Sequence, residues 1–157
     1  QAAADMIAFG AGTGVRVAEA RALRWEHVSL ADGTVDIHGT KSKGSRRRLN
    51  LPAWLQDRLR ARHDVGYVFP SPSGTDPERK WQQSNNAGAL AEVFRGARLD
   101  WETMHSLRRS VATWLHEANV PIVKIADQLG HADPGMAASV YLGRDFEGDK
   151  SSLAELL

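Results

Sequence analysis

Two arginines and a histidine in this sequence are spaced so that they could bind one anion together. His105 and Arg108 lie three residues apart, and on a helix two such side chains stand about 60° apart around the axis. Arg16 precedes Glu19 by three residues, so that carboxylate could hold its guanidinium while the group faces outward. Guanidinium groups stay charged at any working pH and match paired phosphate oxygens. From these residues alone, a surface salt bridge remains the alternative interpretation for Arg16.

A third donor and two phenols extend this set. His131 follows Leu129-Gly130, where the end of a helix can direct a ring into a site, although a capping histidine is the alternative. The two tyrosines are Tyr67 and Tyr141. Tyr67 lies in an apolar strand pattern that favours the core, whereas Tyr141 is predicted in the last turn of a helix.

Length and composition predict one soluble globular domain. The chain has 157 residues, 42% of them hydrophobic and 25% charged, with a net charge of +1 and no cysteine. The absence of cysteine excludes disulfide frameworks, thiolate zinc sites and cysteine nucleophiles. No apolar run approaches the ~20 residues of a membrane span, and the first residues do not resemble a signal peptide, so we expect no membrane and favour the cytosol.

The small net charge hides an uneven distribution. Residues 1–70 contain 11 Lys and Arg against 7 Asp and Glu, whereas residues 71–157 contain 9 against 12, so the two parts carry +4 and −3. One stretch gathers five positive charges without an acid: Lys41, Lys43, Arg46, Arg47 and Arg48. This stretch is either a solvated hairpin tip or a patch that contacts phosphate.

Periodicity and turn signals predict mostly helices with a small antiparallel sheet. We expect a helix from Ala2 to Phe9 that breaks in the glycine-rich stretch Gly10 to Gly14, and a second from Arg16 to Trp25. Alternating apolar residues between Val35 and Leu51 predict the sheet. Pro52 opens a helix that ends near His63. A short strand at 67–69 and a helix at 81–96 complete this part.

The last third is predicted as three further helices and a tail. Thr103 is the expected N-cap of a helix to Ala118, Pro121 and Gly130 bound the next, and the third runs from Asp133 to Gly143. In the first of these helices an apolar face is expected opposite a polar face. The apolar face holds Leu107, Val111, Trp114, Leu115 and Ala118, and the polar face holds His105, Arg108, Arg109 and Ala112.

Five motifs in this order resemble the catalytic domain of the tyrosine recombinases, the phage integrase family. They are Thr13-Gly14-Val15-Arg16 with Glu19 and Leu23-Arg24-Trp25, the basic stretch from Thr40 to Lys43, His105 to Arg109, Leu129-Gly130-His131, and Tyr141. The interval of ten residues from His131 to Tyr141 is one longer than in many members. The resemblance implies an α+β, mostly helical catalytic core with a small antiparallel sheet or hairpin at one edge.

The resemblance also implies roles by position. Arg16 and Arg108 correspond to the arginines that clamp the scissile phosphate, with His105 and His131 as further donors, and Tyr141 to the nucleophile. Lys41 corresponds to the lysine that protonates the departing 5′ hydroxyl, with Lys43 as the alternative. Glu19 corresponds to a supporting acid, and Lys43, Arg46, Arg47 and Arg48 to DNA contacts.

The expected activity is cleavage and rejoining of DNA through a covalent 3′-phosphotyrosine, without ATP, metal or other cofactor, as in site-specific recombination and phage genome integration. Preplaced cationic donors can stabilise the extra negative charge of a five-coordinate phosphorus. The expected partner is double-stranded DNA at attachment or core sites, bound by a homo-oligomer that in the full-length protein is a tetramer. Action in the cytoplasm of a bacterial cell, at the nucleoid, is expected. A silent DNA-binding or assembly module and a type IB topoisomerase are the alternatives.

For domain organisation we expect a catalytic domain at 1–144 and an amphipathic tail at 145–157. Leu153, Leu156 and Leu157 of the tail are expected to dock on the same or a neighbouring protomer. Full-length members carry an N-terminal core-binding domain that we do not find in this sequence, so we expect it to be one part of a longer protein.

Without the core-binding domain, this chain has only half of the clamp that holds DNA in full-length members, so it should bind a core site weakly. Its affinity should fall steeply with salt because phosphate contacts release counterions. A titration of labelled site DNA by fluorescence anisotropy at several salt concentrations measures this. Nanomolar affinity at physiological salt would contradict it.

Overall fold

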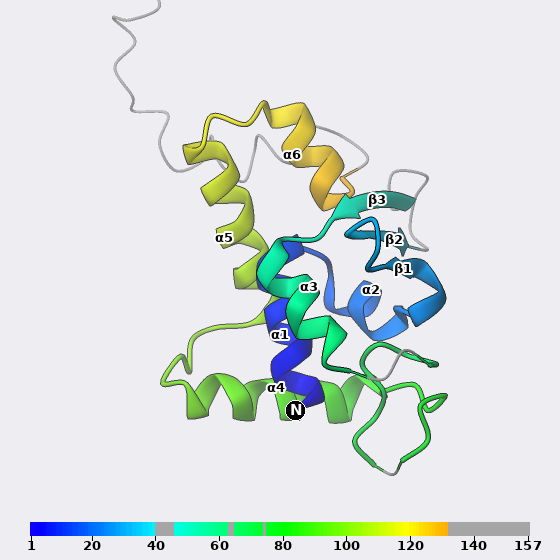
Figure 1. Ribbon diagram of the computed structural model, residues 1–157. Helices are drawn as coiled ribbons and strands as arrows, with labels where there is room; N and C mark the ends of the chain where they lie inside the picture. The colour runs from blue at the N-terminus through cyan, green and yellow to red at the C-terminus, as the bar shows by residue number, and fades with distance from the viewer. Residues whose placement is uncertain (40–45, 63–64, 74, 132–157) are drawn as a thin grey trace, which may run out of the picture.

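The computed structural model describes residues 1–39, 46–62, 65–73 and 75–131. Six α-helices, one short 3-10 helix and three strands are found in this part of the chain (Figure 1). In chain order they are α1 (Ala2–Thr13), α2 (Val17–Ala22), η1 (Trp25–His27), β1 (Val28–Ser29), β2 (Thr34–His38), β3 (Arg46–Asn50), α3 (Ala53–Arg60), α4 (Gln83–Gly96), α5 (Met104–Glu117) and α6 (Ile122–Leu129). The expected fold class, mostly helical with a small antiparallel sheet, is confirmed.

The sheet lies at one edge of the helices (Figure 1). Its strands are antiparallel in the order β1-β2-β3, with Val35 opposite Leu49 and Ile37 opposite Arg47. Val35, Ile37 and Leu49 are buried, as the alternation in the sequence predicted. The strands β2 and β3 therefore each turn one face toward the core, and Arg47 lies on that face of β3 with Leu49.

The main core is built around α1, which runs through the middle of the molecule (Figure 1). Met6 and Phe9 of this helix and Leu55 of α3 are fully buried, and Phe94 of α4 is buried beside them. A second, smaller cluster joins α5 to α6 through Ala112, Ile125 and Leu129. The second cluster fixes the position of α6, whose carboxyl end belongs to the site described below.

The expected break of the first helix at Gly10 is wrong, because α1 continues to Thr13. Gly10 and Gly12 are instead points of close packing. A Cβ at Gly10 would lie 2.5 Å from Cε of Met104, and one at Gly12 would lie 2.9 Å from Cδ2 of Leu55. These glycines let α5 and α3 approach α1, and the chain turns only at Gly14.

Three other expectations differ from the structure in detail. The second helix is shorter than predicted, since α2 ends at Ala22 and a 3-10 turn follows. The helix opened by Pro52 ends at Arg60 rather than near His63. The strand predicted at 67–69 is reduced to one isolated bridge between Arg24 and Tyr67.

The predicted start of α5 and both ends of α6 are confirmed. Thr103 accepts a hydrogen bond from the Ser106 amide at 3.1 Å, and the Ser106 hydroxyl accepts one from the Thr103 amide at 2.7 Å. Pro121 precedes α6, and Gly130 closes it in the left-handed conformation with φ of 65°. This C-cap ends the helix so that His131 follows its last carbonyls directly.

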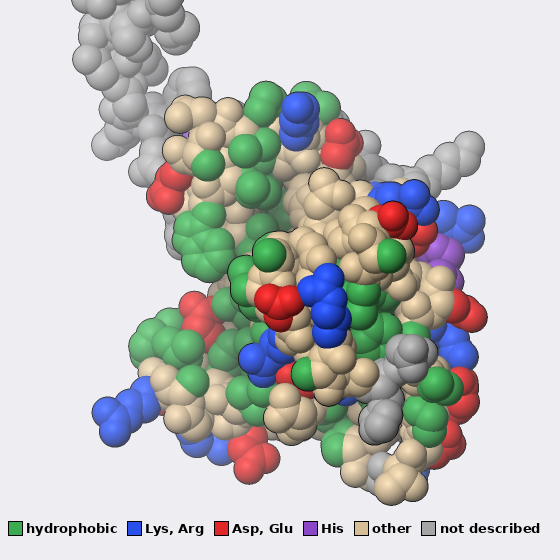
Figure 2. Space-filling view, viewed as in Figure 1, with side chains coloured by type: hydrophobic (Ala, Val, Ile, Leu, Met, Phe, Trp, Pro, Cys, Tyr) green, Lys and Arg blue, Asp and Glu red, His purple; other side chains and the backbone are tan. Residues whose placement is uncertain are grey.

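The polar and apolar faces predicted for α5 are not those observed. Arg108 is buried beside Val111 and Ala112, whereas Trp114, expected on the apolar face, is 55% exposed. Figure 2 shows hydrophobic side chains at the surface over α5 and α6, while acidic and basic side chains adjoin one another over α3. Arg108 can be buried because the carbonyls of Gly14 and Leu129 accept its hydrogen bonds inside the protein. These partners belong to other segments of the chain, so the periodicity of α5 could not predict them.

No helix in the described residues has both the length and the apolar character needed to cross a bilayer.

Replacing Gly14 with alanine should lower the free energy of unfolding by about 2 kcal/mol. Its φ of +71° disfavours a side chain, and a Cβ would lie 2.7 Å from Cδ2 of Leu129. Gly88→Ala in α4 is the matched control, because nothing lies within 4 Å of its Cβ position; it should raise the free energy by about 0.5–1 kcal/mol. Urea unfolding of both variants measures the difference, and equal effects of the same sign would contradict this account.

Candidate active site

Arg108 reaches the carboxyl end of α6 from α5. Its Nη1 donates to the carbonyl of Gly14 at 2.7 Å and its Nη2 to the carbonyl of Leu129 at 2.6 Å. The last carbonyls of a helix have no partner within the helix and carry partial negative charge. These oxygens replace water around the guanidinium, which explains how Arg108 can be only 6% exposed.

Arg16 approaches the same helix end from the start of α2. Its Nη2 donates to the carbonyl of Gly130 at 3.2 Å, and its Nη1 donates to Oε1 of Glu19 at 3.1 Å. Oε2 of Glu19 accepts the backbone N–H of Arg16 at 2.8 Å, which caps α2. The expected Arg16–Glu19 pair is thus present. The Arg16 side chain remains 36% exposed, so part of this cation is available to a bound group.

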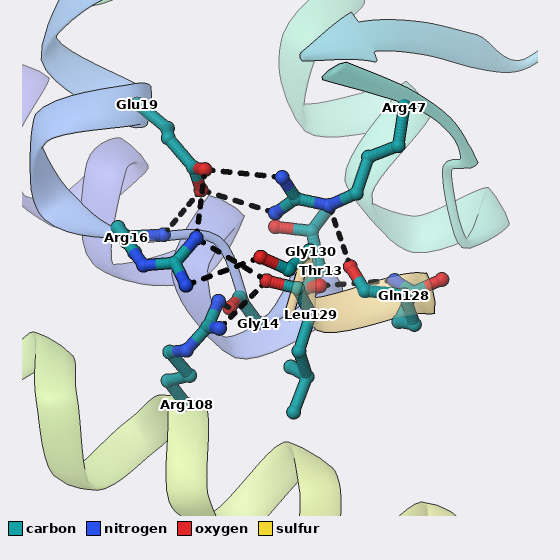
Figure 3. A network of polar contacts seen from close by, with 9 residues as sticks. All are labelled: Thr13, Gly14, Arg16, Glu19, Arg47, Arg108, Gln128, Leu129 and Gly130. Carbon is teal, nitrogen blue, oxygen red and sulfur yellow. Dashed lines mark hydrogen bonds and ion pairs between the residues drawn. The ribbon is translucent and has the colours of Figure 1, made fainter. Parts of the chain in front are cut away.

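Arg47 is the third arginine at the carboxyl end of α6, and it is buried rather than at the surface as the sequence predicted. Its side chain is 8% exposed, whereas we expected a surface contact to DNA. Its Nη1 and Nη2 donate to Oε1 and Oε2 of Glu19, each at 3.0 Å, and its Nε donates to the carbonyl of Gln128 at 2.8 Å (Figure 3). The alternation of β3 contains the signal that was missed, since Arg47 shares the inward face of Leu49.

We call Arg16, Arg47, Arg108 and Glu19 the arginine cluster. Burial alone would raise the pKa of Glu19, but hydrogen bonds from Arg47 and from the Arg16 amide, with the charges of both arginines, lower it below its ordinary value. Glu19 is therefore ionised at neutral pH. Three guanidinium groups against one carboxylate leave the cluster with a charge of +2.

His131 adjoins the cluster, directly after Gly130. Its amide donates to the carbonyl of Ala126 at 2.9 Å, while its Nδ1 is buried and has no hydrogen-bond partner among the described residues. Burial lowers the pKa of His131 to about 4, and the positive charges of Arg108, Arg16 and Arg47 act in the same direction. The ring is therefore neutral at pH 7.

His105 lies in the first turn of α5, one turn before Arg108, and its side chain is exposed. It lines a pocket of about 350 Å³ together with Arg21, Phe94 and Met104. Sequence spacing correctly placed His105 and Arg108 on one helix, but only Arg108 turns into the arginine cluster.

Arg46 and Arg48 lie on the outer face of β3 and are exposed. Arg48 donates to both carboxylate oxygens of Asp36 on β2 at 2.8 Å. Tyr67 is half-buried, with the guanidinium of Arg24 5.0 Å from its ring centre. Lys41, Lys43, Tyr141, the helix expected from Asp133 and the tail at 145–157 lie outside the described residues.

The donor atoms of the site suit an anion rather than a metal ion. Across the described ranges, histidine, aspartate and glutamate side chains form no group of three or more that could hold a metal ion. The donors gathered around the arginine cluster are nitrogen cations, which bind anions.

Comparison with known proteins defines the class to which this fold and site belong. The family model described as the phage integrase family matches residues 2–147. The chain therefore belongs to the phage integrase family.

Curated relatives carry recombinase and integrase names. Tyrosine recombinase XerC of Azotobacter vinelandii is 32% identical over 143 residues, covering 86% of this chain and 46% of that protein. An integrase of Streptomyces ambofaciens is 30% identical over 166 residues, covering 82% of this chain and 41% of that protein. The chain thus spans less than half the length of these relatives.

Solved structures show the same fold. The crystal structure of XerA recombinase matches with a TM-score of 0.72 at 21% identity, over 99% of this chain and 60% of that chain. XerH site-specific recombinase bound to its difH substrate matches with a TM-score of 0.75 at 22% identity, over 98% of this chain and 45% of that chain. The tyrosine recombinase catalytic-domain fold predicted from the sequence is therefore confirmed.

The low pKa of His131 predicts how its titration and the stability depend on pH. The ring should titrate near pH 4 in the folded protein and near 6.5 when unfolded. Between these values the unfolded chain binds more protons, so stability should rise with pH from about 4 to 6.5. Nuclear magnetic resonance of the ring measures the first quantity, and His131→Gln should flatten the second. A midpoint near 6.5 in the folded state would contradict the placement of this ring.

Proposed function

We propose that this chain is the catalytic domain of a site-specific DNA recombinase that cleaves and rejoins strands through a covalent phosphotyrosine. The observation that carries the proposal is the arginine cluster, in which three guanidinium groups and one carboxylate converge at the end of α6 beside a neutral histidine. Its excess of two positive charges favours binding of an anion. Family membership and the DNA-bound relatives make a phosphodiester the natural choice.

The cluster suits a reaction at phosphorus. Attack on a phosphodiester adds negative charge to the phosphorus oxygens, and cationic donors already in place stabilise that charge without reorganisation. The exposed part of the Arg16 guanidinium can bind the phosphate directly, and buried Arg108 adds positive charge from inside the protein. The carbonyls of Gly14, Leu129 and Gly130 orient both groups.

The nucleophile in this proposal is Tyr141. Its oxygen attacks the scissile phosphorus, a new bond joins phosphorus to the phenolic oxygen, and the bond from phosphorus to the 5′ oxygen breaks. The phenolic proton leaves to a base, for which the two candidates are the imidazole rings of His105 and His131. Lys41, or Lys43 in its place, protonates the departing 5′ oxygen. His105 is a further donor to the phosphate.

Rejoining reverses these bonds and needs no ATP. A 5′ hydroxyl attacks the phosphotyrosine, the phosphorus–tyrosine bond breaks, and the phosphodiester is restored. If the 5′ hydroxyl comes from another strand, the result is strand exchange. This chemistry requires the charge of the protein's own arginines and no metal or cofactor.

Double-stranded DNA is the proposed partner. The integrase of the Tn1549 transposon, solved in complex with transposon right end DNA, has the same fold with a TM-score of 0.76. We propose that exposed Arg46 and Arg48 and the lysines of the hairpin contact the backbone of the duplex.

We further propose that the protein assembles as a homo-oligomer, which is a tetramer on synapsed sites, and that the tail at 145–157 docks on the same or a neighbouring protomer. The proposed place of action is the cytoplasm, at the nucleoid.

The test is covalent trapping on a suicide half-site at high protein concentration. The wild-type chain should form an adduct that survives denaturing electrophoresis, and Tyr141→Phe should form none while binding the same DNA with unchanged affinity, because only the phenolic oxygen is removed.

Tyr67→Phe is the matched control, since it removes the other phenol of the chain and leaves the arginine cluster intact. It should form the adduct as the wild type does. An adduct that persists in Tyr141→Phe and disappears in Tyr67→Phe would refute the assignment of the nucleophile, and no adduct from the wild type at any concentration would refute the proposed activity of this chain.

A further inference from the structure

Arg47 has no task in the reaction as described above, yet its guanidinium is one of the most completely bonded groups of the site. We propose that Arg47 is a positioning residue for strand cleavage: it neutralises Glu19, and thereby leaves Arg16 free to bind the phosphate. This inference rests on the proposed function and replaces the DNA contact expected for Arg47 from the sequence.

The carboxylate of Glu19 is shared between two guanidinium groups. Its side chain is 6% exposed, and its Oε1 accepts from both Arg16 and Arg47 while its Oε2 accepts from Arg47 and from the Arg16 amide. Without Arg47, the only cation bonded to this buried carboxylate among the described residues would be Arg16. A buried carboxylate left so poorly paired would draw the Arg16 guanidinium into a bidentate pair. That guanidinium would then be lost to the phosphate.

The same guanidinium holds α6 in place. Nε of Arg47 donates to the carbonyl of Gln128 at 2.8 Å, and Nε2 of Gln128 donates to the carbonyl of Thr13 at 2.9 Å. One side chain of β3 is thus bonded to α2 through Glu19 and to α6, which is itself bonded to the end of α1 (Figure 3). His131 follows Gln128 by three residues, so its ring depends on the same attachment.

Lysine cannot replace this arrangement. Arg47 donates from Nε, Nη1 and Nη2 of one planar group to three different oxygens, whereas the lysine ammonium is a single point charge on a flexible stem. Arg47→Lys should therefore keep the net charge of the arginine cluster and still impair cleavage.

The charge of the cluster separates this role from a purely structural one. Arg47→Met lowers the charge of the arginine cluster from +2 to +1 and leaves Glu19 to Arg16. The double variant Arg47→Met with Glu19→Gln restores +2 and removes the carboxylate that would capture Arg16. The proposal therefore predicts that the second substitution, at Glu19, restores cleavage, which a purely structural role of Arg47 does not predict.

The experiment measures single-turnover cleavage of a half-site together with DNA affinity and thermal stability. We expect Arg47→Met to cleave about 100-fold more slowly, as for a misplaced catalytic group, with affinity changed less than about threefold. The double variant should recover at least about tenfold. Arg24→Met, which removes the ion pair of Nη2 of Arg24 with the two carboxylate oxygens of Glu78 outside the site, is the control and should cleave at the wild-type rate.

The pH dependence supplies a second readout. Loss of Arg47 removes the strongest contact that lowers the pKa of Glu19, so in Arg47→Met this carboxyl should become protonated at a higher pH than in the wild type. A protonated Glu19 is neutral, like the glutamine side chain of the double variant, and releases Arg16. The rates of Arg47→Met and the double variant should therefore converge as the pH falls, and differ most above neutral pH.

Three results would overturn the role of Arg47. If Arg47→Met loses as much DNA affinity as cleavage rate, Arg47 contacts DNA directly. If the double variant is no faster than Arg47→Met at any pH, the role of Arg47 is structural. If Arg47→Met cleaves at the wild-type rate, Arg47 has no role in cleavage. If Arg47→Met does not fold, as judged by circular dichroism, Arg47→Lys with and without Glu19→Gln takes its place. No adduct from both wild type and Arg24→Met would instead contradict the proposed function.

Discussion

The carboxyl end of α6 is the point on which the rest of this site depends. Helix ends leave carbonyl oxygens without partners, and here three consecutive ones, of Gln128, Leu129 and Gly130, accept hydrogen bonds from Arg47, Arg108 and Arg16. These arginines come from β3, α5 and the start of α2. A positive charge that would be costly to bury is solvated by the backbone, and distant segments of the chain are bound to one another at the same time.

Packing of the helices outside the arginine cluster keeps the three arginines together at the end of α6. The glycines of α1 allow α5 and α3 to approach closely, and the small cluster of Ala112, Ile125 and Leu129 seats α6 on α5. Buried Asp5 of α1 pairs with Arg58 of α3 at 2.7 Å and with Arg62. The first helix, which leads to Gly14, is thereby fixed to its surroundings, and the Gly14 carbonyl accepts a hydrogen bond from Arg108.

Electrostatics connects the cluster to its chemistry. Two of the three arginines, Arg16 and Arg47, are bonded to the one carboxylate, Glu19, and the cluster as a whole keeps a charge of +2. Burial, together with the same positive excess, lowers the pKa of His131 and keeps the ring neutral at physiological pH. The chain belongs to the phage integrase family, and the nitrogen cations of this cluster are donors of the kind that binds anions.

The sequence by itself determined the family, the fold class, the caps of α5 and α6, and the pairing of Arg16 with Glu19, because motifs, turn residues and contacts three residues apart are local properties. It did not determine which side of α5 Arg108 occupies, or that Arg47 points inward while Arg46 and Arg48 point outward. Those outcomes depend on carbonyls and a carboxylate contributed by segments up to 94 residues away. Whether an arginine is a surface cation or a buried clamp is decided by its partners, and only the tertiary structure brings these partners together.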